Sequence, residues 1–270
     1  MRYLKALLFV FLPLNFAGCG KTASPPPQTT LTVFAAASLT ESFTDIGKQF
    51  ESANPQVNVA FNFAGSQQLR SQIEAGAAAD VFASANEKEM ATAEGESLVK
   101  ADTIHDFAHN RLVVIFPKDN PAKIASLNNL GKPGIKIDLA DPSVPVGKYS
   151  LAMLDKIAAD PAFGANYKTQ FLANIVSREE NVKAVLSKIR LGEADAGVVY
   201  VTDVTPDAAQ QVGTLDVPGT FNQIAKYPIA VLTHAPQPDL AAKFEDFVLS
   251  DSGQQILHHY NFLPAGAGGQ

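Results

Sequence analysis

The stretch Leu31-Thr-Val-Phe-Ala-Ala-Ala-Ser-Leu-Thr-Glu-Ser-Phe43 joins an apolar run to the start of an amphipathic pattern. The run Leu31–Ala35 is typical of a buried β-strand. Two further alanines follow, and Ser38 then precedes apolar residues that recur on one helical face: Leu39, Phe43, Ile46 and Phe50. Ser38 with Glu41 three residues later predicts a capping box. The stretch therefore predicts a strand, a tight turn and a helix that begins beside a serine hydroxyl.

The same pattern returns about 25 residues later, where the run Val57–Phe63 is followed by Ala64-Gly65-Ser66 and then by Leu69 and Ile73. The first backbone N–H groups of a helix have no intrahelical acceptor. Together with a hydroxyl they can bind an anion without a cation. Two such serines indicate an anion site, although serine is also a common N-cap with no role in binding. On these residues alone both interpretations stay open.

Composition excludes several classes of function. The chain has 270 residues, of which 46% are hydrophobic and 18% charged, so it is long enough for a large core. The formal net charge of −6 argues against a nucleic-acid partner. Cys19 is the single cysteine, so we expect no disulfide framework, no cysteine nucleophile and no thiolate metal site.

The N-terminal residues predict export. Arg2 and Lys5 precede an apolar segment that is too short to span a bilayer, which takes about 20 residues. Phe16-Ala-Gly-Cys19 resembles a bacterial lipoprotein signal, with residues 1–18 as the signal peptide and Cys19 as the lipidated residue. Phe16 stands where such signals usually have leucine, and a plain signal peptide cleaved nearby is the alternative.

Residues 19–30 include Pro25-Pro26-Pro27 and predict a semi-rigid tether after the lipidated cysteine. Cleavage before Cys19 would change the net charge from −6 to −8, because the removed segment carries two basic residues and no acidic one. The mature protein would thus be an acidic chain held at a membrane surface.

Along the rest of the chain, apolar strand patterns alternate with helical patterns. The expected strands are 31–35, 57–63, 80–83, 111–116, 135–139, 196–201 and 228–232. The expected helices are 39–52, 67–75, 87–93, 148–159, 181–191 and 240–249. This alternation predicts an α/β fold with largely parallel sheets covered on both faces. Ligands of such folds bind beyond the carboxyl ends of strands, which here points to Ser38, Ser66, the loop 141–147 and Tyr200.

Six short motifs occur in one order between Leu31 and about Leu263. They are Phe34-Ala-Ala-Ala-Ser-Leu39, Phe63-Ala-Gly-Ser66, Ile73-Glu-Ala-Gly76 with Ala79-Asp-Val-Phe82, Asp141-Pro-Ser-Val-Pro-Val-Gly147, Glu180-Asn-Val-Lys183 and Gly197-Val-Val-Tyr200. Together they resemble the molybdate-binding proteins of bacterial ABC importers, within the type II periplasmic-binding-protein family. The resemblance implies a two-lobed fold, each lobe a mostly parallel sheet flanked by helices. It assigns residues 31–115 with 228–270 to the first lobe and 116–227 to the second, hinged near Phe116 and Tyr227.

The resemblance also implies which groups would hold the oxyanion. Ser38 and Ser66 would each donate a hydroxyl and a backbone N–H, Val146 and Val182 a backbone N–H each, and Tyr200 its phenol. Position 146 is often alanine in the family, so valine could narrow the pocket, and Gly65 replaces a common serine. Without the family match, Tyr200 and Val182 would be read as core residues. Molybdenum would be bound only as molybdate, through these same donors, and no cofactor is expected.

The function implied by the resemblance is capture of molybdate, and of tungstate, by the substrate-binding component of an ABC importer. The implied partners are the oxyanion, a permease in the inner membrane and the membrane itself through lipidated Cys19. We expect a monomer in the periplasm or outside the cytoplasmic membrane, with no nucleic acid bound.

Other readings of the same residues stay open. Another small anion such as sulfate is the first alternative, whereas a carboxylate ligand would normally require an arginine fork, which the six motifs lack. An enzyme on the same scaffold is the second, although the sequence has no zinc spacing, no Gly-x-Ser-x-Gly elbow and no P-loop. A lipoprotein with a purely structural role is the third. Asp80 and Asp141 are expected to hold loops, and His258-His259 do not share a helix face, which argues against a metal site.

Overall fold

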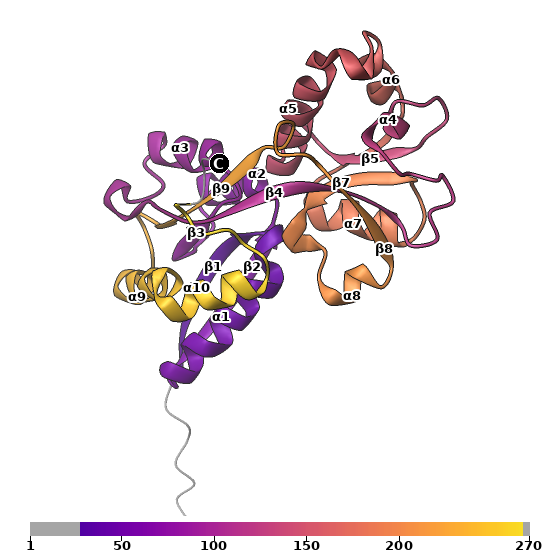
Figure 1. The fold of residues 1–270 in the computed structure, drawn as a ribbon. Helices are drawn as coiled ribbons and strands as arrows, with labels where there is room; N and C mark the ends of the chain where they lie inside the picture. Colours follow the sequence, from indigo (N-terminus) through magenta and orange to yellow (C-terminus); the bar gives the residue numbers. More distant parts are fainter. Residues whose placement is uncertain (1–27, 267–270) are drawn as a thin grey trace, which may run out of the picture.

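The computed structural model describes residues 28–266. Strands from distant parts of the chain lie in two groups, and β4 (His105–Pro117) joins the groups (Figure 1). We call lobe I the group around β1, β2 and β3 with its helices, and lobe II the group around β5, β6, β7 and β8. The order of strands is β2-β1-β3-β9-β4-β7-β5-β6, with β8 also paired to β4. The α/β two-lobed fold expected from the sequence is confirmed.

Lobe I is built on parallel strands that end on the same side. β1 (Thr29–Ala36) pairs in parallel with β2 (Val57–Ala64) and β3 (Val81–Ala83). Its helical elements are η1 (Ala37–Leu39), α1 (Thr40–Ala53), α2 (Ser66–Glu74), α3 (Glu87–Gly95), η2 (Ala101–Thr103), α9 (Pro238–Leu249) and α10 (Asp251–His259). The core of this lobe contains a cluster of phenylalanine rings from α1, β4 and α9, in which Phe43 contacts Phe107 and Phe244 with centroids 5.6 and 6.1 Å apart.

Lobe II repeats the arrangement. β5 (Ile137–Ala140) pairs in parallel with β6 (Ile175–Glu179) and β7 (Ala196–Tyr200). β8 (Val212–Asp216) lies antiparallel to β4. The helical elements are α4 (Leu127–Leu130), α5 (Pro145–Ala159), η3 (Pro161–Phe163), α6 (Tyr167–Ala173), α7 (Val182–Arg190), η4 (Val201–Asp203) and α8 (Pro206–Ala209).

Two strands connect the lobes. β4 pairs with β9 (Ile224–Val231) from His105 to Arg111 and with β7 from Leu112 onward, so it changes partner within one strand. Asn222 bridges this change, because its side chain accepts from the Leu112 N–H at 2.9 Å and donates to the Leu112 carbonyl at 2.8 Å. The lobe boundaries at 116 and 227 stay predictions. The connection itself is antiparallel, unlike the parallel pairs inside each lobe.

The differences from the expected elements have local causes. Strands β6 and β8 and helices α4, α6, α8 and α10 were not expected. β6 has the sequence Ile-Val-Ser-Arg-Glu with alternating exposure, so it lacks a continuous apolar run. Helices α4 and α8 are four residues long, too short for a helical period to be visible. The signal peptide, Cys19 and most of the tether lie outside the described residues, and none of the helices within 28–266 is long and apolar enough to cross a bilayer.

Candidate functional site

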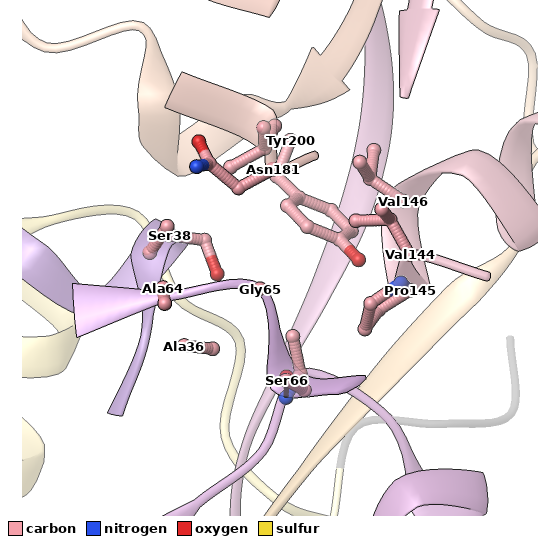
Figure 2. A pocket seen from close by; sticks show the side chains of 13 residues that line it. Ala36, Ser38, Ala64, Gly65, Ser66, Val144, Pro145, Val146, Asn181 and Tyr200 are labelled. Atoms are coloured by element: carbon pink, nitrogen blue, oxygen red, sulfur yellow. Dashed lines mark hydrogen bonds between the residues drawn. The ribbon is translucent and has the colours of Figure 1, made fainter. Parts of the chain in front are cut away.

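A small pocket lies where the two lobes face each other (Figure 2). Both lobes contribute to its wall, and the lining residues are Ala36, Ala37, Ser38, Ala64, Gly65, Ser66, Ala85, Val144, Pro145, Val146, Asn181, Val182 and Tyr200. None of these residues carries a charge. The five residues named from the sequence, Ser38, Ser66, Val146, Val182 and Tyr200, are all among them, so the structure brings together groups spread over more than 160 residues of chain.

Ser38 reaches the pocket through a 3₁₀ turn and not as a helix cap. It lies in η1, directly after β1, and α1 begins two residues later at Thr40. No side chain caps either helix, so the predicted capping box of Ser38 and Glu41 is wrong. The reason is tertiary: the Ser38 hydroxyl is hydrogen-bonded to the Tyr227 hydroxyl at 2.9 Å instead. Figure 2 shows the Ser38 hydroxyl directed into the space between the labelled residues.

Ser66 is the first residue of α2, after Gly65 at the N-cap. Its backbone N–H is therefore one of the amides that have no intrahelical acceptor. Its Oγ accepts a hydrogen bond from the Ala85 N–H at 3.0 Å. A Cβ added at Gly65 would lie 2.7 Å from the carbonyl of Glu180 in lobe II, so this glycine allows the lobes to approach.

Helix α5 begins with Pro145, which has no N–H, so Val146 provides its first backbone donor. A Cβ at Gly147 would lie only 2.1 Å from the carbonyl of Asp141, which means that only glycine lets the helix start so close to the preceding loop. The Asp141 carboxylate accepts from the Ser143 N–H at 2.9 Å and from its hydroxyl at 2.7 Å. Its expected role as a loop-holding group is confirmed.

Helix α7 presents its N-terminus to the pocket from another direction. Asn181 is the N-cap, and its side-chain oxygen accepts from the Ala184 N–H at 3.0 Å. This leaves the Val182 N–H at the helix start without an intrahelical acceptor. Asn181 also lines the pocket. Asn181 was not predicted as a lining residue, although an asparagine just before an apolar helical run is a recognisable N-cap signal.

The Tyr200 hydroxyl is the one lining side-chain group, among the described residues, that is buried without any hydrogen-bond partner. Tyr200 is 1% exposed and ends β7. Burial raises the pKa of its phenol well above the ordinary value. The phenol therefore keeps its proton at neutral pH and is available as a donor. Such a buried, unpaired hydroxyl costs stability unless a ligand accepts its hydrogen.

Charged groups stand behind the pocket wall and not in it. Lys183 Nζ lies 2.8 Å from Glu41 Oε2 in lobe I and 3.1 Å from Asp203 Oδ1 in lobe II. Burial opposes the charge of Lys183, but the carboxylates of Asp203 and Glu41 outweigh it and raise the pKa of the ammonium. The other oxygen of Asp203 accepts the backbone N–H of Tyr200 at 3.0 Å. Asp203 was not identified from the sequence and Tyr227 was named only as a hinge position, because their contacts beside the pocket form only in the folded chain.

The other candidate groups lie elsewhere. Asp80 accepts backbone N–H bonds from Thr32 and Gln237, both at 2.7 Å, which confirms its structural role. His258 and His259 are exposed on α10. Within residues 28–266 no group of three or more histidine, cysteine, aspartate and glutamate side chains could hold a metal ion. The pocket is thus a set of neutral donors in an otherwise apolar wall.

Comparison with known proteins places the sequence among solute-binding proteins. Residues 31–263 match the family described as bacterial extracellular solute-binding protein. The chain is 38% identical over 267 residues to the molybdate-binding protein ModA of Mycobacterium tuberculosis, covering 95% of each chain.

Solved structures show the same architecture. One of them is the substrate-binding domain of a protein assigned as a molybdenum ABC transporter from Clostridium difficile. It aligns with a TM-score of 0.64 at 30% identity, covering 87% of this chain and 98% of that one. The sulfate-binding protein SubI from Mycobacterium tuberculosis aligns with a TM-score of 0.78 over 88% and 87% of the two chains. At 18% identity the likeness to SubI concerns the fold alone.

Proposed function

Because the chain belongs to the family of bacterial extracellular solute-binding proteins, we propose that it captures molybdate, and tungstate equally, for an ABC importer. The family places the protein outside the cytoplasm and makes it a binding protein and not an enzyme. The observation that carries the choice of ligand is the pocket between the lobes, in which neutral hydrogen-bond donors converge without a charged side chain. The ligand is cargo, and no cofactor is part of the proposal.

The donors suit a small, fully deprotonated oxyanion. Ser38 and Ser66 would supply a hydroxyl and an amide each, Val146 and Val182 an amide each, and Tyr200 its phenol. A hydrogen bond to a charged group contributes about 1.5–3 kcal/mol, so these seven donors contribute roughly 10–20 kcal/mol before costs. Dehydration of the dianion and ordering of the two lobes oppose binding. A net of about −8 kcal/mol, which is a micromolar dissociation constant, is consistent with these values.

Sulfate has the same charge and shape as molybdate but is smaller, so the proposed preference for molybdate and tungstate requires that the size of the pocket exclude sulfate. Val146 and Val182 would bind the ligand through their backbone amides alone, so their side chains are free to narrow the pocket. Tungstate nearly matches molybdate in charge and size, so no useful discrimination between them is expected. Sulfate capture remains the alternative function, and the likeness in fold to a sulfate-binding protein is compatible with it.

Calorimetric titration of the mature chain with molybdate, tungstate, sulfate and phosphate tests this proposal. Molybdate and tungstate should bind at micromolar concentrations or tighter, and sulfate and phosphate at least about a hundredfold more weakly, a difference of about 2.7 kcal/mol. Sulfate binding as tight as molybdate binding would replace the proposed ligand. A chain that binds none of the four would lose the proposed function altogether.

The proposal extends to the membrane. The chain would act as a monomer, anchored by a lipid on Cys19, and its closed, liganded form would dock on a permease in the inner membrane. Fractionation of cells that express the native chain or Cys19→Ala tests the anchor. The native protein should sediment with membranes and the variant should be released; equal release of both would favour a plain signal peptide.

A further inference from the structure

A chain of hydrogen bonds runs behind the pocket from Ser38 to Asn110. Ser38 Oγ lies 2.9 Å from the Tyr227 hydroxyl, which in turn lies 3.3 Å from Asn110 Nδ2. Asn110 Nδ2 also lies 2.8 Å from the Thr202 hydroxyl oxygen. We call these four residues the relay. All four are 4% exposed or less, so their hydrogen bonds are not exchanged with bulk water.

The direction of each hydrogen bond in the relay follows from Asn110, at the end away from the pocket. The backbone N–H of Arg111 can only donate, and it lies 2.9 Å from Asn110 Oδ1. This contact fixes which end of the Asn110 amide is oxygen and which is nitrogen. Asn110 Nδ2 has two hydrogens and no acceptor capacity. It therefore donates to both Thr202 and Tyr227.

The next hydrogen bond toward the pocket joins Tyr227 to Ser38. Tyr227 has one hydroxyl hydrogen, and burial raises the pKa of this phenol well above its ordinary value, so the hydrogen stays bound. Tyr227 has two hydrogen-bond partners among the described residues, and Asn110 Nδ2 cannot accept, so the buried Tyr227 hydrogen finds its acceptor in Ser38 Oγ. Ser38 Oγ then accepts a hydrogen bond on the side that faces Tyr227, and its own hydrogen is free to point into the pocket.

The second serine of the pocket, Ser66, also accepts a hydrogen bond, but from a different kind of donor. Ser66 Oγ accepts from the Ala85 backbone N–H, which can only donate. Its hydroxyl hydrogen is likewise left for a ligand. Each serine thus accepts one hydrogen bond from behind the pocket: Ser66 from a main-chain amide and Ser38 from a tyrosine hydroxyl.

We propose that Asn110 and Tyr227 determine specificity by fixing Ser38 as a donor, so that the pocket rejects tetrahedral oxyanions that carry a proton. The inference rests on the proposed function, since it concerns the same site. A protonated oxygen, as in monohydrogen phosphate, needs an acceptor, and a Ser38 hydroxyl free to rotate could provide one. The relay removes that possibility. Asn110 and Tyr227 are positioning residues in this account, because they act on the ligand through Ser38.

The variant Tyr227→Phe tests the proposal with a matched pair of ligands. Sulfate and monohydrogen phosphate have the same shape and, at mildly alkaline pH, the same charge, and differ in the proton. The quantity to measure is the ratio of their dissociation constants, by calorimetry or by competition with molybdate. In the native chain phosphate should bind more weakly than sulfate, and in Tyr227→Phe the ratio should fall by about tenfold, since one hydrogen bond to a charged ligand changes sense.

The matched control is Tyr260→Phe, which removes a phenol hydroxyl bonded to Asp45 away from the pocket lining. Its ratio should equal that of the native chain. The Tyr227→Phe ring keeps its edge contacts with Phe107 and Phe262, at 6.2 and 5.4 Å between centroids, so the packing is retained. Thermal unfolding without ligand checks that both variants are folded.

A second variant, Asn110→Asp, should reverse the relay. A carboxylate can only accept, so the Tyr227 hydrogen would turn to residue 110 and the Ser38 hydrogen to Tyr227, leaving Ser38 an acceptor toward the pocket. The added charge repels both dianions equally and cancels in the ratio. The ratio should therefore fall further than in Tyr227→Phe.

The outcomes separate the two proposals. A native chain that binds oxyanions, with folded variants whose sulfate-to-phosphate ratio is unchanged, overturns the relay and leaves the proposed function intact. If Tyr227→Phe does not fold, the ratio in Asn110→Asp decides. A native chain that binds no tetrahedral oxyanion overturns the proposed function and the relay with it.

Discussion

Lys183 Nζ lies 2.8 Å from Glu41 Oε2, so an ion pair joins helix α7 of lobe II to helix α1 of lobe I beside the pocket. Two further contacts cross at the same place: Gln68 Nε2 donates to the Glu180 carboxylate at 3.0 Å, and Gln67 Nε2 donates to the Glu180 carbonyl at 3.1 Å. These bonds exist only when the lobes are close. The structure is therefore a closed arrangement, and its polar contacts between lobes lie next to the helix start that provides the Val182 amide.

Removal of the charge on Glu41 should loosen this closed arrangement. Glu41→Gln keeps Lys183 paired with buried Asp203, so the change is confined to the contact between lobes. Because the pair is partly exposed, we expect a loss in molybdate affinity of only about 0.5–1 kcal/mol, which shrinks as salt is added. Calorimetry at low and high salt measures it. Asp45→Asn, whose acid pairs with Lys48 inside lobe I, is the control; equal effects in both variants would exclude a role in closure.

Ser38→Ala removes one pocket donor and should weaken molybdate binding by about 1.5–3 kcal/mol. It also leaves the Tyr227 hydroxyl without its acceptor, so the unliganded protein should lose some stability. The control is Ser42→Ala, a buried serine bonded to the Leu39 carbonyl at 3.2 Å and outside the pocket lining. Titration and thermal unfolding of both variants measure the two effects. An unchanged dissociation constant in Ser38→Ala would remove this residue from the site.

Tyr200→Phe should move binding and stability in opposite directions. The variant loses a donor, so molybdate affinity should fall by about 1.5–3 kcal/mol. It also removes a buried hydroxyl that has no partner, so the free energy of unfolding without ligand should stay the same or rise. Tyr167→Phe, whose hydroxyl donates to the Leu127 carbonyl at 2.6 Å, is expected to do the reverse: lower stability and unchanged affinity. A destabilised Tyr200→Phe would contradict the unpaired state of this phenol.

Gly147→Ala should disturb the start of α5. The added Cβ would lie 2.1 Å from a backbone carbonyl, which cannot move aside as a flexible side chain can. We expect a loss of about 1–3 kcal/mol in the free energy of unfolding and weaker oxyanion binding, because the Val146 amide is displaced. Gly95→Ala, with open space around its Cβ at the end of α3, is the control and should be neutral. Chemical denaturation and calorimetry distinguish the variants.

Buried Asp138 should make the stability of lobe II depend on pH. It is fully buried, its oxygens have no hydrogen-bond partner, and burial together with Glu179 raises its pKa from 3.8 to about 7. The folded state thus holds a proton that the unfolded chain releases near pH 3.8. The contribution of this group to stability is complete below that pH and is lost as pH rises through about 7, by at most about 1.4 kcal/mol per pH unit.

Asp138→Asn has no such proton to lose, so this part of the decline between about pH 4 and pH 7 should disappear. Denaturation midpoints measured across this range test it, with exposed Asp119→Asn as the control. A native chain and an Asp138→Asn variant with parallel pH profiles would show that Asp138 is already ionised in the folded state.

Much of the fold was accessible from local patterns. The runs that became β1 and β2 are rich in apolar residues, and the helices after them repeat with a helical period, so seven strands and six helices were expected near their observed positions. Several of the elements that were missed are short, such as α4 and α8, or lie at an edge of the sheet, such as β6, where solvent on one side removes the apolar run. A pattern can reveal an element only when burial imposes a period on it.

The five pocket residues could be named from motifs that lie within a few residues of each other, since a strand end and a helix start are local events. What the motifs left open was the environment of each group. The sequence predicts that Ser38 caps its own helix, but Tyr227, 189 residues away, is hydrogen-bonded to its hydroxyl instead. Lys183 and Glu41, which are 142 residues apart in the sequence, likewise meet only in the folded chain.

The amino-acid order by itself therefore determined most of the elements and, through the family motifs, which five residues line the pocket. The tertiary structure alone decided the direction in which those donors point and the charges that hold the lobes together. The physical reason is that hydrogen-bond sense and ion pairing depend on which groups meet after the chain has crossed twice between the lobes, and no local period records such a meeting.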